Sequence, residues 1–161
     1  MAAPVTAFIG IGSNLDDPQR QVLTAFEALA KLPQSELRSR SSLYRTPPMG
    51  PPDQPDYINA VAELSTQLAP HRLLDELQRI ERLHHRDRKQ HWGPRTLDLD
   101  LLIYGAEILD DTRLRVPHPG LAARAFVVIP LAEIAPEFPI PGLASPRLLC
   151  ASVAQSTISK L

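Results

Sequence analysis

Asp98 and Asp100 are the side chains of this sequence best suited to chemistry, because they alternate within a predicted strand. They lie in the sequence WGPRTLDLDLL, which occupies residues 92–102. Alternate side chains of a β-strand share a face, so both aspartates point to one side and the intervening leucines to the other. At a rise of ~3.3 Å per residue, their Cα atoms lie about 6.6 Å apart. Two carboxylates at this separation can converge on one or two small, hard cations, which would offset the cost of burying them.

Positive charge gathers immediately before this strand. Residues 79–95 contain six Lys and Arg against two acidic residues, together with three histidines. A polyphosphate substrate bound with magnesium needs both features, because Mg²⁺ binds carboxylates and phosphate oxygens together while arginines neutralise the remaining charge. The combination predicts such a substrate, although a bare Asp-x-Asp is also compatible with a polar strand face open to solvent.

A second candidate binding element is the proline-rich loop at residues 45–57, which leads into a strand bearing Tyr57 and Asn59. Such a loop can cover a flat polar ring, with Tyr57 stacking on the ring and Asn59 forming hydrogen bonds to it. Tyr57 taken alone is equally compatible with an aromatic residue at the edge of the core. His118, between two prolines, is more typical of a turn or a cap than of a catalyst.

Composition and motifs exclude several classes of protein. The 161 residues include 17 basic and 18 acidic side chains, and a net charge of −1 argues against binding nucleic acid or an anionic membrane through bulk charge. The single cysteine, Cys150, cannot form an intramolecular disulfide. No stretch approaches the ~18 apolar residues of a membrane helix, so we expect a soluble, cytoplasmic protein. The glycine pattern of dinucleotide-binding sites, the P-loop and zinc-ligand spacings are all missing.

The elements that must position these residues follow from hydrophobic period and from proline. Strands are predicted at 5–11, 35–44, 57–68 and 96–104, and helices from Pro18 to Pro33 and from Pro70 through Ile80. A third helix is predicted from near Pro119 to Ile134 and a last one over 146–157. The order βαββαβ is typical of a ferredoxin-like α+β fold, an antiparallel sheet with two helices on one face and here with additional C-terminal helices. We expect one domain spanning residues 1–161.

Five motifs in this order resemble those of the folate-pathway enzyme family 6-hydroxymethyl-7,8-dihydropterin pyrophosphokinase. The likeness runs over residues 8–137, and its motifs are RTPPMG at 45–50, QPDYIN at 54–59, QRIE at 78–81, WGPRTLDLD at 92–100 and VPHP at 116–119. The family fold is a ferredoxin-like α+β domain. The resemblance implies that the β- and γ-phosphates of ATP move together, as pyrophosphate, onto the hydroxymethyl oxygen of the pterin, which releases AMP.

The resemblance also implies a role for each matching residue. Two Mg²⁺ ions would be bound with ATP by Asp98 and Asp100, and the catalytic residues would be Arg86, Arg95, Asp98 and Asp100. The pterin would contact Thr46, Pro47, Met49, Tyr57, Asn59, Trp92, Asp98 and Phe126, with its ring between those of Tyr57 and Phe126. The nucleotide would contact Gln78, Glu81, Arg88, Lys89, Trp92, Leu101, Arg113, Arg115, His118 and Arg124. The implied partners are ATP and the pterin, without nucleic acid or membrane, and the protein is expected to be a monomer.

Two other functions remain compatible with parts of the pattern. A ferredoxin-like RNA-binding module could use the arginine-rich loop for phosphates and Tyr57 or Trp92 for stacking, but the two aspartates would repel a phosphate backbone in the absence of a metal. A phosphotransferase that moves a single phosphoryl group would release ADP instead of AMP. The nucleotide product distinguishes this alternative from pyrophosphoryl transfer.

Overall fold

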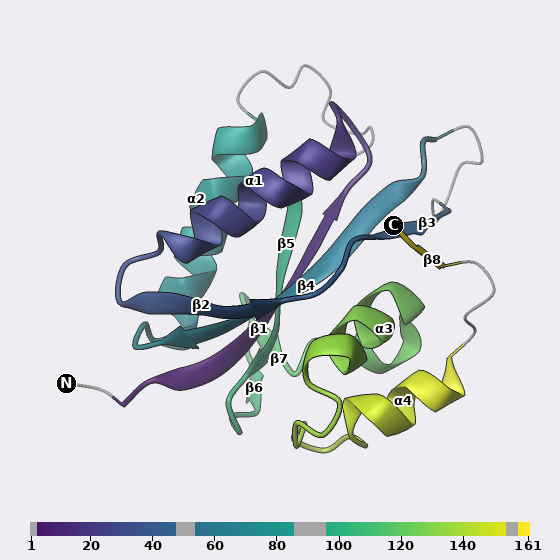
Figure 1. Cartoon of the computed structure of the whole chain (residues 1–161). Helices are drawn as coiled ribbons and strands as arrows, with labels where there is room; N and C mark the ends of the chain where they lie inside the picture. Colours follow the sequence, from purple (N-terminus) through teal and green to yellow (C-terminus); the bar gives the residue numbers. More distant parts are fainter. Residues whose placement is uncertain (1–2, 48–53, 86–95, 154–157) are drawn as a thin grey trace.

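A computed structural model describes residues 3–47, 54–85, 96–153 and 158–161 of the chain (Figure 1). Six strands form one sheet, in the order β5-β1-β4-β3-β8, and β2 also pairs with β4. The strands of this sheet are β1 (Val5–Ser13), β2 (Ser35–Arg40), β3 (Tyr44–Thr46), β4 (Tyr57–Thr66), β5 (Asp98–Tyr104) and β8 (Ser159–Lys160). All of these pairs are antiparallel. A separate hairpin joins β6 (Leu109–Asp110) to β7 (Arg115–Val116).

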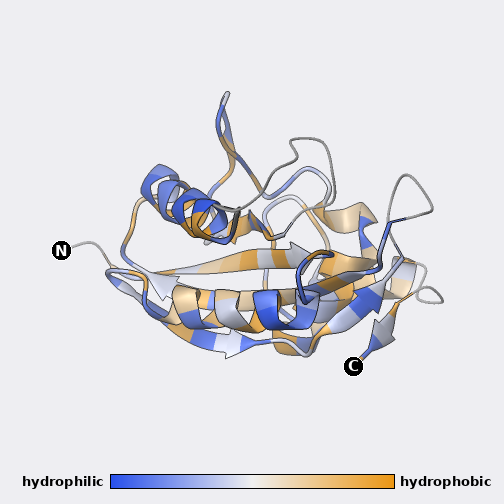
Figure 2. Ribbon diagram, turned by 90° about the horizontal axis from the view of Figure 1, so that it is seen from above, coloured by the Kyte–Doolittle hydropathy of each residue, from blue (hydrophilic) through white to orange (hydrophobic). Residues whose placement is uncertain are grey.

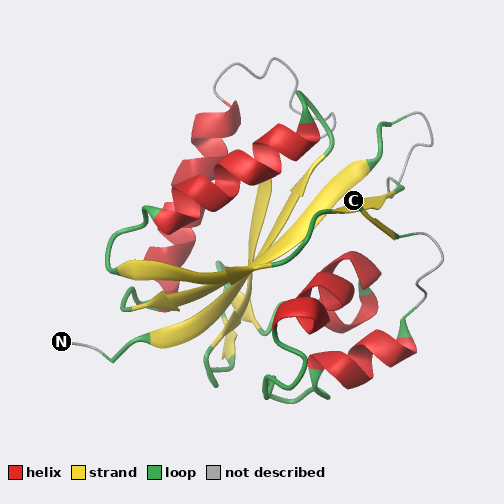
Figure 3. Ribbon diagram, in the orientation of Figure 1, coloured by secondary structure: helices red, strands yellow, loops and turns green. Residues whose placement is uncertain are grey.

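Helices cover both faces of the sheet (Figure 3). One face carries α1 (Pro18–Ala30) and α2 (Pro70–His85), and the other carries α3 (Ala125–Ile134) and α4 (Pro146–Ser152). A 3₁₀ turn, η1 (Leu121–Ala123), precedes α3. In α1 the first helical residue is proline and the buried side chains recur at helical spacing, so its local sequence agrees with its packing.

One hydrophobic cluster lies on each face of the sheet, because alternate residues of each strand point to opposite faces. Figure 2 shows hydrophobic residues along the central strands. Ile9 and Ile11 of β1 face α1 and α2, whereas Phe8 packs on the other side with Val127 and Leu131 of α3. Within the described ranges, no helix is long and apolar enough to cross a membrane.

The predicted strand at 35–44 is wrong as a single element. The structure divides it into β2 and β3, both paired with β4. Arg40 faces Ala62 and Tyr44 faces Asn59. The segment from Arg40 to Tyr44 therefore advances four residues while β4 advances three, and the extra residue forms a bulge. Ser41 lies at this bulge and still bonds to Val61 through both its backbone N–H and its hydroxyl group.

The C-terminal elements also differ from the prediction. Helix α3 begins at Ala125 and not near Pro119, because the chain first makes the 3₁₀ turn and Arg124 is extended. Helix α4 ends at Ser152, and residues 154–157 of the predicted helix lie outside the described residues. The strands β6, β7 and β8 were not predicted, because two residues are too few to show an alternating pattern.

Candidate active site

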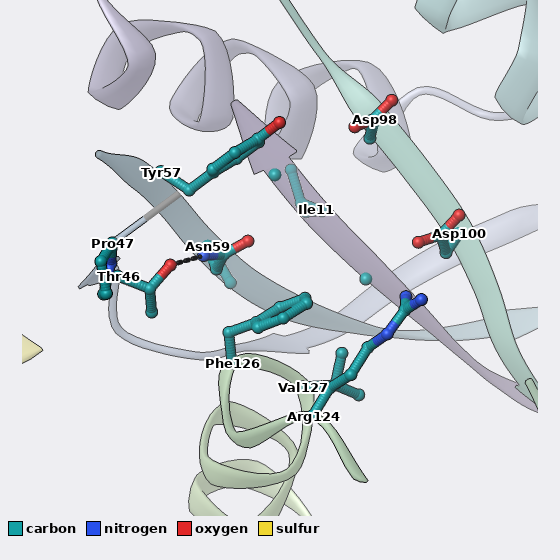
Figure 4. A pocket seen from close by; sticks show the side chains of 13 residues that line it. Ile11, Thr46, Pro47, Tyr57, Asn59, Asp98, Asp100, Arg124, Phe126 and Val127 are labelled. Atoms are coloured by element: carbon teal, nitrogen blue, oxygen red, sulfur yellow. Dashed lines mark hydrogen bonds between the residues drawn. The ribbon is translucent and has the colours of Figure 1, made fainter. Parts of the chain in front are cut away.

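A pocket of about 200 Å³ opens on the face of the sheet that α3 covers (Figure 4). Its floor comes from β1 and β5, and its walls come from β3, β4 and the start of α3. The lining residues are Gly10, Ile11, Gly12, Thr46, Pro47, Tyr57, Asn59, Ala60, Asp98, Asp100, Arg124, Phe126 and Val127.

Cross-strand register places the two carboxylates on the pocket floor. Asp98 faces Gly12, and Asp100 faces Gly10 on β1. Side chains of directly opposed residues point to the same face of a sheet, and both aspartates line the pocket while the leucines beside them are buried on the opposite face. The structure therefore confirms that the two carboxylates share one face.

Glycine at position 12 leaves room for the neighbouring Asn59. The two residues face each other across β1 and β4, and a Cβ atom at Gly12 would lie 2.9 Å from Oδ1 of Asn59. The Asn59 amide cannot easily move aside, because its Nδ2 donates a hydrogen bond of 2.8 Å to Oγ1 of Thr46. Asn59 therefore directs its carbonyl oxygen over the glycine, where it can accept a hydrogen bond from a ligand.

Two aromatic rings form opposite walls of the pocket. Figure 4 shows Tyr57 at the start of β4 and Phe126 at the start of α3, with Asn59 between them. A slot with aromatic walls and a few fixed polar groups selects flat heterocycles that carry hydrogen-bonding edges.

A cationic side chain lies between the aromatic wall and the carboxylates. The Arg124 guanidinium lies 5.8 Å from the Phe126 ring centroid, and in Figure 4 it points toward Asp100. The Arg124 side chain packs against Gly120, where an added Cβ atom would lie 2.7 Å from Nε of Arg124. The lack of a side chain at position 120 thus lets the arginine reach the pocket.

His118 is held beside β5 and is neutral at neutral pH. Its backbone N–H donates to the carbonyl of Leu102, and its Nδ1 accepts a hydrogen bond of 3.0 Å from the backbone N–H of Gly120. Burial lowers the pKa of His118, and the opposing effect of the Asp100 charge does not cancel this shift. The neutral ring therefore carries its proton on Nε2, which remains a donor.

The comparisons with known proteins identify the family. The family model for 7,8-dihydro-6-hydroxymethylpterin-pyrophosphokinase matches residues 8–136. The chain is 50% identical over 137 residues to the 2-amino-4-hydroxy-6-hydroxymethyldihydropteridine pyrophosphokinase of Haemophilus influenzae, covering 85% of this chain and 86% of that protein. It is 49% identical over 145 residues to the Pseudomonas aeruginosa protein of the same name, covering 89% and 90%. The chain belongs to the pyrophosphokinase family.

Solved structures agree with this assignment at the level of the fold. The crystal structure of Plasmodium falciparum HPPK-DHPS with SDX-DHP is similar over 97% of this chain with a TM-score of 0.73. The sequence identity is 13%, and this chain spans 47% of the length of that one. At such low identity, the likeness shows a shared fold.

Within this pyrophosphokinase fold, the residues expected to bind the pterin come together. All of those that the structure describes line the pocket, namely Thr46, Pro47, Tyr57, Asn59, Asp98 and Phe126. Among the described residues that were expected to contact the nucleotide, Arg124 alone lines the pocket. Met49, Arg86, Arg88, Lys89, Trp92 and Arg95 lie outside the described residues.

Gln78 of α2 and both Arg113 and Arg115 of the β6–β7 hairpin were also expected to contact the nucleotide, and none of the three lines the pocket. Arg113 bonds to Asp75 at 2.7 Å and to Oε1 of Gln78 at 3.3 Å, where the β6–β7 hairpin meets α2. Arg115 pairs with Asp110 at 3.1 Å.

The side chain of Leu101 is 3% exposed and packs in the core beneath α1 and α2, so a nucleotide contact at this position would be made by the backbone.

Sequence reasoning missed the residues that form the floor of the pocket. Gly10 and Gly12 belong to an incomplete dinucleotide motif, and the predicted strand at 5–11 ends before Gly12. In the structure β1 continues to Ser13, which places both glycines on one face and leaves space above the sheet. Ile11, Ala60 and Val127 carry no chemical signal and are found only from the pocket itself.

Proposed function

We propose that this chain transfers pyrophosphate from ATP to the hydroxymethyl group of 6-hydroxymethyl-7,8-dihydropterin, releasing AMP and forming the pterin diphosphate used in folate biosynthesis. The observation that carries the proposal is the pocket, in which two carboxylates of β5 adjoin an aromatic slot with a fixed amide. Family membership supports the same reaction.

The pterin ring would lie between Tyr57 and Phe126. The Asn59 carbonyl would accept a hydrogen bond from the amide or amino edge of the ring, and Thr46 would hold the Asn59 amide in that orientation. This arrangement directs the hydroxymethyl group toward Asp98 and Asp100 at the far side of the pocket (Figure 4).

The donor set fits magnesium. Mg²⁺ binds one or two carboxylates and completes an octahedral shell with water and phosphate oxygens. Asp98 and Asp100 line the pocket from one strand, so they would share two Mg²⁺ ions with the ATP phosphates. Bound Mg²⁺ neutralises phosphate charge and lowers the pKa of a coordinated hydroxyl.

The reaction is an in-line displacement at the β-phosphorus. The pterin hydroxymethyl oxygen forms a bond to that phosphorus, the bond to the oxygen of the α-phosphate breaks, and AMP leaves with that oxygen. The hydroxyl proton passes to solvent or to a phosphate oxygen. The protein supplies position and charge, so Arg86, Arg95 and Arg124 would stabilise the transferred group. The nucleotide would be held by Gln78, Glu81, Arg88, Lys89, Trp92, Arg113, Arg115 and His118. The pterin would be covered by Met49 and Trp92.

The remaining features of the proposal concern the whole chain. We propose a ferredoxin-like core, which the neighbouring order β5-β1-β4 with β2 and β3 beyond β4 supports. We propose that residues 1–161 act as one domain, which the match of the family model to residues 8–136 supports, and that the protein acts as a monomer. A net charge of −1 supports action without nucleic acid or membrane, and the use of ATP supports a cytoplasmic location.

The test is an incubation with ATP, Mg²⁺ and 6-hydroxymethyl-7,8-dihydropterin, followed by chromatography of the nucleotides. We expect AMP to form only when the pterin is present. Release of ADP would show that a single phosphoryl group moves, and no turnover by a folded sample would reject the proposed reaction.

Glu81 offers a prediction about the metal-binding strand. Its Oε2 accepts a hydrogen bond of 2.8 Å from the backbone N–H of Leu99, which lies between the two aspartates. Residues that orient metal ligands typically contribute 10–100-fold to metal affinity. We expect Glu81→Ala to raise the Mg²⁺ concentration for half-maximal activity by about tenfold.

The conservative variant provides the control. Glu81→Gln keeps an acceptor for the Leu99 N–H and is expected to raise the Mg²⁺ requirement less than Glu81→Ala does. Magnesium titrations of initial rate measure both variants. Equal Mg²⁺ requirements for Glu81→Ala and the wild type would show that this hydrogen bond does not position the carboxylates.

A further inference from the structure

We propose that Glu133, through its hydrogen bonds to Tyr44 and Ser42, is a positioning residue that sets the distance between the two walls of the pterin pocket. This inference rests on the proposed function. Glu133 lies outside the pocket and would act on the ligand only through the elements that it joins.

The two walls belong to elements that are far apart in the sequence. One wall comes from β3 and β4 and includes Thr46 and Tyr57, and the other comes from the start of α3 with Phe126. Apolar contacts of Val127 and Leu131 attach α3 to the sheet. Apolar packing has no directional preference, so it does not by itself fix how far along the sheet the helix lies.

Glu133 supplies directional contacts between α3 and the β3 segment. Its Oε1 accepts a hydrogen bond of 2.6 Å from the Tyr44 hydroxyl, and its Oε2 accepts one of 2.7 Å from the Ser42 hydroxyl. The backbone N–H of Ser42 also donates to this carboxylate at 3.0 Å. Lys160 of β8 lies 3.9 Å from Oε2, a longer and more exposed ion pair that contributes little.

Protonation reinforces this arrangement at neutral pH. Burial raises the pKa of the Tyr44 phenol, and the hydrogen bond to Glu133 raises it further. Burial also raises the pKa of Glu133, but the hydrogen bonds from Tyr44 and Ser42 outweigh it and leave that pKa below its ordinary value. The contact is therefore a neutral phenol that donates to a carboxylate, which is stronger than a hydrogen bond between neutral groups.

Both ends of this contact lie in line with pocket residues. Tyr44 precedes Thr46 by two positions on β3, so their side chains point to the same face, and both are buried. Phe126 precedes Glu133 by seven residues, which is about two turns, so they lie on the same side of α3.

The register of the sheet extends this alignment to the catalytic carboxylates. A cross-strand row runs from Lys160 of β8 through Tyr44, Asn59 and Gly12 to Asp98 of β5. Figure 1 shows β8 beside β3 at one edge of the sheet. Since β3 has three residues, its pairing with β4 and β8 alone is short, and the bond to Glu133 adds a third attachment.

The test compares Tyr44→Phe with Tyr104→Phe. Both changes remove one hydroxyl from a buried tyrosine of the sheet, but the Tyr104 hydroxyl donates to the carbonyl of Leu68, on the face opposite the pocket. We expect Tyr44→Phe to raise the KM for the pterin about tenfold, with less than a twofold change in the KM for ATP. Tyr104→Phe is expected to lower the unfolding temperature without changing either KM. Glu133→Gln, which keeps the side-chain shape, should resemble Tyr44→Phe.

Direct pterin binding separates the possible failures. The affinity is measured by fluorescence titration for the wild type and for each folded variant. If the wild type binds the pterin and both Tyr44→Phe and Glu133→Gln bind it with unchanged affinity, the positioning role alone is overturned. The same conclusion follows if Tyr104→Phe weakens pterin binding as much as they do. No pterin binding by the folded wild type would overturn the proposed function and this inference with it.

Discussion

Asp98→Asn and Asp100→Asn are each expected to lower kcat by about 1,000-fold, which corresponds to about 4 kcal/mol of transition-state stabilisation. Each substitution keeps the shape of the side chain and removes one negative charge from the pocket floor. Weaker metal binding would leave the charge of the transferred pyrophosphate poorly neutralised. Initial rates of AMP formation at saturating ATP and pterin measure the effect, over a range of Mg²⁺ concentrations.

A matched variant excludes a general effect of lost charge. Glu36→Gln removes one carboxylate charge from β2. The Glu36 side chain is 69% exposed and, within the described residues, forms an ion pair with Arg38. We expect its kcat to equal that of the wild type. We expect the two aspartate variants to keep the wild-type fold, because Asn fills the same space as Asp. Near-normal rates for both in saturating Mg²⁺ would contradict their assignment as metal ligands.

Gly12→Ala is expected to reduce kcat/KM for the pterin by about 100-fold, because small displacements of positioning groups have effects of this size. The added Cβ atom would lie 2.9 Å from Oδ1 of Asn59, so either the amide or the strand must shift. Any shift disturbs the hydrogen bond from Asn59 to Thr46 and misplaces the group that reads the edge of the ring. Steady-state kinetics with varied pterin measures the loss.

Gly10→Ala provides a graded comparison on the same face of the same strand. Its Cβ atom would meet Cδ2 of Leu102 at 3.3 Å, a contact that a flexible side chain can relieve. We expect a smaller loss of kcat/KM than for Gly12→Ala. The reverse order, or a Gly12→Ala enzyme with normal pterin kinetics, would show that the Asn59 amide is not held against the glycine for ligand binding.

The regular elements of the fold were predictable because their signals are local. Helix α1 has a proline at its start and a stripe of buried residues at helical spacing, and β4 has apolar residues at the alternate positions 58, 60, 62 and 64. The same alternation predicts the shared face of Asp98 and Asp100 from the sequence alone. Local pattern was sufficient here because burial of one face determines it.

Features that depend on register were not predictable. The bulge between β2 and β3 and the two-residue strand β8 arise from pairing with distant segments. The contact between Glu133 and Tyr44 joins residues 89 positions apart, and no periodicity signals it. The role of Gly12 likewise follows from its position opposite Asn59, which only the register of β1 and β4 reveals.

A crystal structure of the protein with 6-hydroxymethyl-7,8-dihydropterin, a non-hydrolysable ATP analogue and Mg²⁺ tests the central claim most directly. We predict the pterin ring between Tyr57 and Phe126, its edge bonded to Asn59, and its hydroxymethyl oxygen in line with the β-phosphorus. Metal density should lie against both Asp98 and Asp100. A pterin bound outside this pocket, or magnesium bound without either aspartate, would contradict the account.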